Sequence, residues 1–543
     1  MTELKNYQHQ EEAIEMCKDL EYSALFMEMG TGKTRVVIKI AEHKYLKGDI
    51  DAILLIAPNH VHTQFVTEQM PTHCSVPYTS LIWSSQKKNN VSYVNRMDDL
   101  FTPKMDKLKV FAVNVEAFQS DSIVPFIATY VKHNKVFTII DEATRIKTPK
   151  AKRSKTIHKL EKYGQRCILT GTPVTKSPFG LWSMFEFLKH NYFGVNFFIF
   201  QARHGVMMQG VNEHTGGRYK TLIDEKTWNI TLNKIKAYEE GRGEAGLMFT
   251  DFEDVASEMS LSVKNVLFIH KQKAFIKYKR LDELKEAIDS ITFYAKKKDC
   301  LDLPDKIYET VFLEMGKEHR RVYNTLKSKM LVEYEGKDLT VLNKVALTTR
   351  LMQICGGYFP YVEEKDIEIG SNLITIEKKQ GMLIGTKNIK LERIKEEFDE
   401  MSSFPVIIWA KFVLELENIY KELKKDYKCA LYYGKTRTAE RETIIEDFKA
   451  GEYDILIINP SVGAFGLNLQ NATTQFYYSN GFNVEERLQS EDRSHRIGVK
   501  GNCLYKDFAF KDSIDEKITR AITTGRDMNE FFSGNTLREI LED

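Results

Sequence analysis

A glycine-rich loop near the start of the chain has the residue types and spacing of a phosphate-binding site. Residues 27–34 read Met-Glu-Met-Gly-Thr-Gly-Lys-Thr, between a short apolar run and a helical pattern over 35–43. Glycines allow backbone N–H groups to turn toward phosphate oxygens, and the start of a helix adds a favourable field. Lys33 would reach the β- and γ-phosphates of ATP, and the Thr34 hydroxyl would bind Mg²⁺. The loop predicts ATP binding by six residues: Met29, Gly30, Thr31, Gly32, Lys33 and Thr34.

Two adjacent acids form the second candidate site. Asp141 and Glu142 follow the apolar, β-rich run 136–140. The last side chains of a strand in an open α/β sheet face the crevice at its carboxyl edge. Asp141 would hold Mg²⁺ there, and Glu142 would orient and deprotonate the attacking water. Two solvated acids at a strand end are the plainer alternative, but their place after the loop strand favours a catalytic pair.

A third short segment, Leu-Thr-Gly-Thr-Pro at 169–173, also ends an apolar run. Its small hydroxyl residues could hydrogen-bond the acidic pair and sense the γ-phosphate. Such a segment alone indicates only a turn. In this position we interpret it as a coupling element.

The late part of the chain supplies arginines at helical spacing. Gln489, Arg493 and Arg496 are four and three residues apart, so a helix over 489–498 would present them on one face. A guanidinium can neutralise the charge that spreads over transferring phosphoryl oxygens. A salt-bridged surface helix is the alternative, because four acids lie close by. We expect Lys33, Glu142 and these three residues to be catalytic, with ATP in a cleft between two domains.

Two groups of short apolar runs must position these residues. The expected buried strands are 24–27, 52–57, 110–113, 136–140 and 166–169, and later 406–409, 454–458 and 475–478. Helical patterns lie between them, so each group predicts its own doubly wound parallel sheet. The expected fold is therefore α/β, with two RecA-like domains and helical insertions.

The organisation of the chain follows from these groups. The stretch 185–291 has few strand runs and many charged helical windows, and 356–386 is punctuated by glycines and indicates a hairpin. We predict four parts: 1–190, RecA-like domain 1 with the ATP motifs; 191–300, a helical insertion and the end of that domain; 301–390, a helical and hairpin linker region leading into the second motor domain; and 391–543, RecA-like domain 2 with the arginines.

Composition excludes several classes of protein. The 543 residues are 28% charged with a net charge of +2, and no apolar run approaches the roughly 18 residues of a membrane span. Seven isolated cysteines without a C-x-x-C pair argue against a disulfide framework and a structural zinc site. We expect a cytoplasmic protein. Any nucleic-acid surface must be local, and the basic clusters at 145–159 and 296–298 are candidates for it, or are simply solvated faces.

Together the motifs resemble those of the Snf-type DNA translocases, a branch of helicase superfamily two. Residues 141–147 read Asp-Glu-Ala-Thr-Arg-Ile-Lys, with Thr144 where the family usually has histidine. Residues 489–498 are nearly the family's Gln-Ala-Glu-Asp-Arg-Ala-His-Arg-Ile-Gly. Tyr7-Gln8 looks like the family's adenine-reading element, and 461–471, which includes Gly466, looks like the motif that contacts DNA and the ATP site.

The resemblance covers roughly residues 4–515 and implies ATP and Mg²⁺ as cofactors and duplex DNA as the partner. It implies an ATP-dependent motor that moves along duplex DNA, in a compact bacterial or phage member of the family. It also assigns Gln8 and Gly466 to ATP. Two alternatives are a strand-separating DNA or RNA helicase and a catalytically silent nucleic-acid-binding scaffold. The scaffold is disfavoured because six catalytic-type residues are all present: Lys33, Thr34, Asp141, Glu142, Arg493 and Arg496.

Overall fold

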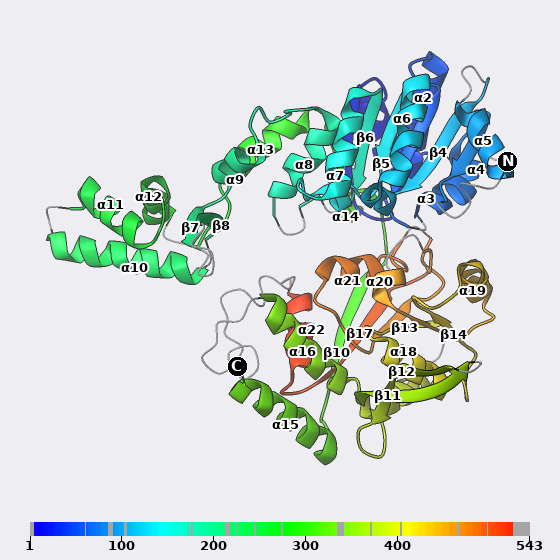
Figure 1. Cartoon of the computed structure of the whole chain (residues 1–543), viewed down its shortest axis with the longest axis vertical. Helices are drawn as coiled ribbons and strands as arrows, with labels where there is room; N and C mark the ends of the chain where they lie inside the picture. The colour runs from blue at the N-terminus through cyan, green and yellow to red at the C-terminus, as the bar shows by residue number, and fades with distance from the viewer. Residues whose placement is uncertain are drawn as a thin grey trace. The chain divides into compact units, whose positions relative to one another are not determined.

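The chain forms two compact units in the computed structural model, Met1–Cys300 and Leu301–Asp543 (Figure 1). The structure describes residues 5–524 except for short gaps at 60, 85–90, 102–105, 172, 175–176, 212–217, 224, 244–245, 273–274, 334–340, 370–371, 402–403, 464–466 and 497. Each unit contains one parallel sheet covered by helices, so the α/β prediction is confirmed.

The sheet of unit 1 has seven strands in the order β3-β4-β2-β5-β6-β1-β9, and every neighbouring pair is parallel. The strands are β1 (Tyr22–Met27), β2 (Ala52–Ala57), β3 (Tyr78–Ile82), β4 (Leu108–Asn114), β5 (Val136–Ile140), β6 (Gln165–Thr170) and β9 (Thr292–Ala295). The five expected strands are β1, β2, β4, β5 and β6. The two edge strands, β3 and β9, escaped prediction because they are only partly buried and carry polar residues.

Alternate side chains of these strands enter two separate cores. Leu25 and Met27 belong to the core under α1 (Gln8–Cys17) and α2 (Lys33–Lys47). Ala24 and Phe26 belong to the core on the opposite face. That face is covered by α5 (Val91–Phe101), α6 (Val124–His133), α7 (Lys152–His158), α8 (Phe179–Leu188), α9 (Phe197–His204) and α13 (Leu281–Asp289).

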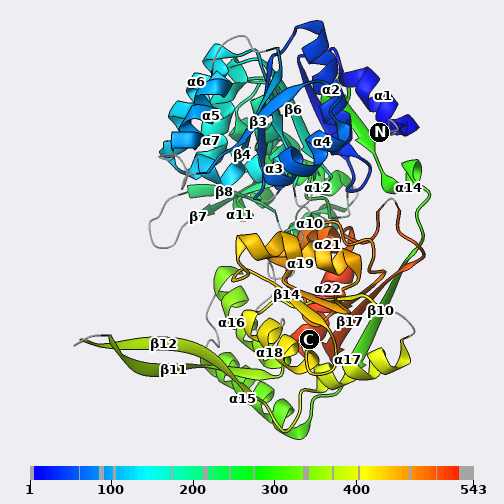
Figure 2. The ribbon, with the colours of Figure 1, turned by 90° about the vertical axis from the view of Figure 1, so that its right-hand side faces the viewer.

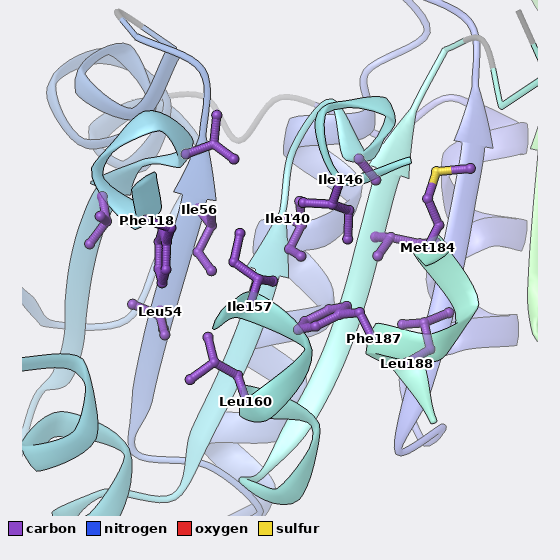
Figure 3. Close-up of a cluster of buried hydrophobic side chains, with 14 of the residues drawn as sticks. Leu54, Ile56, Phe118, Ile140, Ile146, Ile157, Leu160, Met184, Phe187 and Leu188 are labelled. Atoms are coloured by element: carbon purple, nitrogen blue, oxygen red, sulfur yellow. The ribbon is translucent and has the colours of Figure 1, made fainter. Parts of the chain in front are cut away.

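Figure 3 shows part of this second core, including Ile140, the last residue of β5. Ile56 of β2 and Ile140 of β5 point toward Ile157 of α7, beside Phe187 of α8. All four side chains are fully buried. The strand end that carries Asp141 therefore rests on a tightly packed apolar layer.

Three helices of unit 1 have a core of their own. This helical insertion contains α10 (Glu225–Arg242), α11 (Phe249–Glu258) and α12 (Val263–Gln272), packed around the buried Trp228. An antiparallel pair, β7 (Met207–Val211) and β8 (Arg218–Leu222), lies beside it, and Met208 of β7 packs against the same core. The largely helical character expected for this region is confirmed, whereas its two-stranded ribbon was not predicted.

The sheet of unit 2 has six parallel strands in the order β10-β17-β16-β13-β15-β14. They are β10 (Lys306–Leu313), β13 (Val406–Trp409), β14 (Cys429–Tyr432), β15 (Ile455–Ile458), β16 (Thr474–Tyr477) and β17 (Cys503–Phe510). The three expected late strands are β13, β15 and β16. The strand β17 joins β10, from nearly 200 residues earlier, to this central group.

The helices of unit 2 cover both faces of its sheet. They are α15 (Lys317–Glu333), α16 (Val341–Cys355), α17 (Ile389–Glu400), α18 (Val413–Leu423), α19 (Thr438–Ala450), α20 (Pro460–Gly463), α21 (Val484–Glu491) and α22 (Ile514–Thr523). The expected hairpin is present as the antiparallel pair β11 (Tyr358–Ile369) and β12 (Asn372–Leu383), drawn as a long ribbon in Figure 2. Within the described residues, no helix is both long enough and apolar enough to span a bilayer.

Candidate active site

The phosphate-binding loop lies between the end of β1 and the start of α2. Gly30 and Gly32 have φ angles of 84° and 91°, which residues with a side chain rarely adopt. Thr31 between them is fully buried, and its hydroxyl donates to the carbonyl of Glu28 at 2.7 Å. The loop therefore folds back on itself and leads directly into Lys33, the first residue of α2.

Two residues of α1 form hydrogen bonds with the backbone of this loop. His9 Nε2 and Gln10 Nε2 both donate to the carbonyl oxygen of Thr31, at 2.8 and 3.0 Å. A Cβ atom at Gly32 would overlap Gln10 Nε2, so a side chain there would have to displace the Gln10 amide as well as adopt a strained φ. Neither residue of α1 was singled out from the sequence, although both lie within two residues of Gln8.

Gln8, the expected adenine contact, has a different environment. Its side chain is exposed and donates to Glu12 Oε1 at 2.9 Å, on the surface of α1. Its role toward adenine stays a prediction. Thr34, the expected ligand of Mg²⁺, lies half-buried in the first turn of α2.

The acidic pair follows β5 directly, as expected. The backbone N–H of Asp141 donates to the carbonyl of Ile56 at 2.9 Å, and this hydrogen bond holds Asp141 at the edge of the sheet. Its carboxylate accepts a hydrogen bond from the N–H of Glu142 at 2.9 Å. Both acidic side chains are more than nine-tenths buried. They are therefore not the solvated acids of the plainer alternative.

The pKa of Asp141 is raised to about 6, and burial is the main cause. The neighbouring charge of Glu142 also raises this pKa, whereas the ammonium group of Lys33 lowers it. Lys33 can exert this effect only from nearby, so the fold brings the phosphate-binding loop and the acidic pair together. They come from β1 and β5, which are separated in the sheet by β6.

Glu142 has an unusual backbone. Its φ of 52° and ψ of 56° are left-handed, a conformation that costs a non-glycine residue about 1–3 kcal/mol. The short helical turn Ala143–Ile146 follows at once, and the N–H of Arg145 donates to the Glu142 carbonyl at 2.9 Å. Ala143 and Ile146 are fully buried and hold the strained turn in place. Such strain is typical of a functional site.

The third motif lies against the phosphate-binding loop. A Cβ atom at Gly171 would be 3.3 Å from both the backbone N and the Cγ of Met29. Thr170, the last residue of β6, is fully buried. Thr172 lies outside the described residues. The coupling role of this segment stays a prediction, which its contact with Met29 supports.

The arginine motif is not one continuous helix, so that part of the prediction is wrong. The helix α21 ends at Glu491, and turns follow. The carbonyl of Gln489, which a longer helix would pair with the N–H of Arg493, accepts from Arg493 Nε instead, at 3.0 Å. The carbonyl of Arg493 accepts from the N–H of Leu469 at 3.0 Å. The N–H of Arg493 turns to the carbonyl of Ser490 at 3.2 Å, and the 467–469 segment takes up the Arg493 carbonyl, so the regular helix does not continue.

Both arginines nevertheless converge on one backbone oxygen. Arg493 Nη1 and Arg496 Nη1 donate to the carbonyl of Leu467 at 3.2 and 3.1 Å. Arg493 is buried and Arg496 half-buried, and burial lowers the pKa of the Arg496 guanidinium. Gln489 is also buried, and its Oε1 has no hydrogen-bond partner in the described residues. Gly466, beside Leu467, lies outside the described residues.

Comparison with known proteins agrees with these motifs. Residues 9–356 match the SNF2-related domain, and residues 389–498 match the helicase conserved C-terminal domain. The chain is 23% identical over 507 residues to the nuclear protein STH1/NPS1 of Saccharomyces cerevisiae, covering 90% of this chain and 32% of the yeast protein. It is 23% identical over 572 residues to an uncharacterized ATP-dependent helicase of Mycoplasma pneumoniae, covering 100% of this chain and 44% of that protein.

Among solved structures, the chain aligns with the Sulfolobus solfataricus SWI2/SNF2 ATPase core in complex with dsDNA. It is 17% identical, with a TM-score of 0.37, and the alignment covers 99% of this chain and 97% of that one. The chain spans less than half the length of the yeast and Mycoplasma relatives. The SNF2-related domain match covers well over half of the chain, and the chain therefore belongs to the SNF2-related family of ATP-dependent helicases.

Proposed function

We propose that the chain hydrolyses ATP to move along duplex DNA and to remodel DNA or protein–DNA complexes. One observation carries the hydrolysis part of the proposal. Lys33 of the phosphate-binding loop acts electrostatically on the buried Asp141, and Glu142 lies beside it. A phosphate-binding cation, a carboxylate for the metal and a candidate base are thus gathered in one place.

The residues of unit 1 divide the chemistry between them. Lys33 would neutralise charge on the β- and γ-phosphates, and Glu142 would orient the attacking water and accept its proton. The Thr34 hydroxyl and the Asp141 carboxylate are hard oxygen donors of the kind that Mg²⁺ prefers, so the residues present fit this ion. When bound, Mg²⁺ would neutralise negative charge on the phosphate oxygens.

Unit 2 would supply the remaining positive charge. We propose that Arg493 and Arg496 stabilise the charge that develops on the transferring phosphoryl group, with Gln489 assisting. Their guanidinium groups already lie side by side on the Leu467 carbonyl. Hydrolysis would then require both units.

Sequence similarity and one basic cluster support the proposal that the chain moves along duplex DNA. A Bacillus subtilis relative, 23% identical, is described as a putative ATP-dependent helicase/translocase. The cluster 145–159 follows the acidic pair, and Lys150 and Lys155 in it are exposed. Phosphate contacts of this kind bind DNA without reading its sequence. The second cluster is a weaker candidate because Lys297, its middle residue, is buried.

The test compares two substrates side by side. A translocase should displace the third strand of a triplex in an ATP-dependent reaction and should leave the strands of a forked duplex paired. The Glu142→Gln protein is the control, because it should do neither. Efficient unwinding of the fork without triplex displacement would overturn the proposal and favour a strand-separating helicase.

A further inference from the structure

A buried ion pair anchors the helix that precedes the two arginines. Arg487 of α21 forms a two-point contact with Asp507 of β17: Nη1 to Oδ1 at 2.6 Å and Nη2 to Oδ2 at 2.9 Å. The two side chains are 6% and 1% exposed. A planar guanidinium matches a carboxylate in this arrangement, and a lysine ammonium cannot reproduce it.

Further contacts use most of the remaining donors of Arg487. Its Nη1 also donates to Asn480 Oδ1 at 2.9 Å, and its Nε donates to Glu491 Oε1 at 2.9 Å. The guanidinium carbon lies 3.4 Å from the centre of the Tyr477 ring, which gives a cation–π contact. A buried charge with this many partners has one well-defined position.

Glu491 extends the same network to a third strand. Its Oε2 accepts from Tyr308 at 2.7 Å and from Lys306 at 3.1 Å, both on β10. Its backbone carbonyl accepts from the Tyr505 hydroxyl of β17 at 3.0 Å. The last turn of α21 is therefore fastened to β16, β17 and β10 by its buried face.

The position of this last turn matters because the arginines follow it immediately. Arg493 lies two residues beyond Glu491, in a turn where its N–H donates to the carbonyl of Ser490 at 3.2 Å. The position of the C-terminal end of α21 on the sheet therefore sets the positions of Arg493 and Arg496. The opposite face of α21 carries a half-buried ion pair, Glu486 with Lys411 at 3.3 Å.

We propose that Arg487, paired with Asp507 and Glu491, is a positioning residue for the two catalytic arginines. The inference rests on the proposed role of Arg493 and Arg496 in hydrolysis. A displacement of about 1 Å from the reactive geometry can cost about 10²-fold in rate. Loss of the pair should therefore lower kcat for ATP, and should leave ATP binding at Lys33 nearly unchanged.

Single substitutions cannot test this alone, because they leave a buried charge without a partner and endanger folding. The informative protein is the double variant Arg487→Met/Asp507→Leu, which replaces the ion pair by apolar side chains. Replacing a buried ion pair in this way often leaves the stability of a protein unchanged or raises it. The matched control is Lys506→Met/Glu397→Leu. This second pair also has one member on β17, its N–O distance is 2.5 Å, and it lies outside the α21 network.

The readouts are kcat with duplex DNA, affinity for a fluorescent ATP analogue, and thermal unfolding. The expected result is a kcat about 10²-fold lower in the first double variant, with analogue affinity within about twofold and a cooperative unfolding transition. The control should keep its kcat. Arg487→Lys should retain only part of the rate, because it keeps the charge and loses the two-point contact.

Two outcomes would overturn the inference. The first is a wild-type kcat in a folded Arg487→Met/Asp507→Leu protein. The second is an equal loss of kcat in the control pair, which would show a general effect of destabilising unit 2. Failure of the proposed function would look different, because the wild-type protein itself would then show no DNA-stimulated hydrolysis.

Discussion

The ammonium group of Lys33 lowers the pKa of the Asp141 carboxyl group, against the burial and the Glu142 charge that raise it to about 6. Lys33 begins the helix after β1 and Asp141 follows β5, two strands that β6 separates in the sheet, and the two residues lie 108 positions apart in the sequence. The electrostatics of the site therefore depend on the loop and the acidic strand end at once.

Asp141→Asn should stabilise unit 1 at pH 7.5 by about 2–3 kcal/mol, from a pKa difference of about two units. A carboxyl group whose folded pKa lies above its usual 3.8 is protonated more readily in the folded state. Ionising it costs stability as pH rises from about 4 to about 6, and the full cost is present above pH 6. The gain from Asn should thus shrink by about half at pH 5. Urea unfolding of unit 1 at the two pH values measures it.

The control for this prediction is Asp19→Asn. Asp19 is exposed, and hydrogen bonds from Lys47 and His43 lower its pKa, so removing its charge should bring no gain at pH 7.5. Equal gains for Asp141→Asn at pH 5 and pH 7.5 would contradict the proposed cause.

Substitutions of Lys33 and Glu142 should impair different steps, ATP binding in the first case and ATP hydrolysis in the second. Lys33→Ala should weaken ATP binding, because the proposed role of this side chain is to bind the phosphates directly. Glu142→Gln keeps the shape of the side chain and should bind ATP normally, but hydrolyse it about 10²- to 10⁴-fold more slowly. Equilibrium binding and single-turnover hydrolysis separate the two effects. Turnover by Glu142→Gln at the wild-type rate would show that Glu142 is not the base.

Gly32→Ala should disrupt nucleotide binding for two reasons. Alanine is strained at a φ of 91°, by about 1–2 kcal/mol, and its Cβ would also displace Gln10 from the Thr31 carbonyl. Gly48→Ala is the matched control: Gly48 ends the same helix with a φ of 81° and has nothing within 4 Å of an added Cβ. Both proteins should lose similar stability from strain, and only Gly32→Ala should lose affinity for an ATP analogue. Equal affinities would argue against the contact with α1.

Central features of the fold could be predicted from the sequence because they leave local patterns. Strands such as β2 and β5 are buried on both faces and appear as continuous apolar runs, and the loop glycines are required by backbone geometry. Edge strands carry weaker patterns. The strand β3 reads Tyr-Thr-Ser-Leu-Ile and is mostly half-buried, so its sequence does not separate it from a loop.

The parts of the site that escaped prediction depend on partners distant in the sequence. Arg487 and Asp507 are 20 residues apart on different elements, and nothing near either residue indicates the other. The hydrogen bonds of Arg493 to the 467–469 segment likewise override a spacing that is helical in the sequence. His9 and Gln10 were missed because their partner is a backbone carbonyl in the loop, which has no signature in the sequence.

Arg493→Ala should abolish ATP hydrolysis and leave DNA affinity largely intact. Its side chain donates to the Gln489 and Leu467 carbonyls, and its proposed role is at the transferring phosphoryl group rather than on the DNA strand. Binding to duplex DNA should instead rest on exposed lysines, and should weaken steeply between low and moderate salt for wild type and variant alike. Arg520→Ala, which removes an exposed arginine of the same unit, should keep hydrolysis. Fluorescence anisotropy with two unrelated duplexes across a salt series measures affinity, and steady-state ATPase measures turnover. A variant that lost DNA affinity in parallel with hydrolysis would place Arg493 on the DNA rather than at the phosphoryl group.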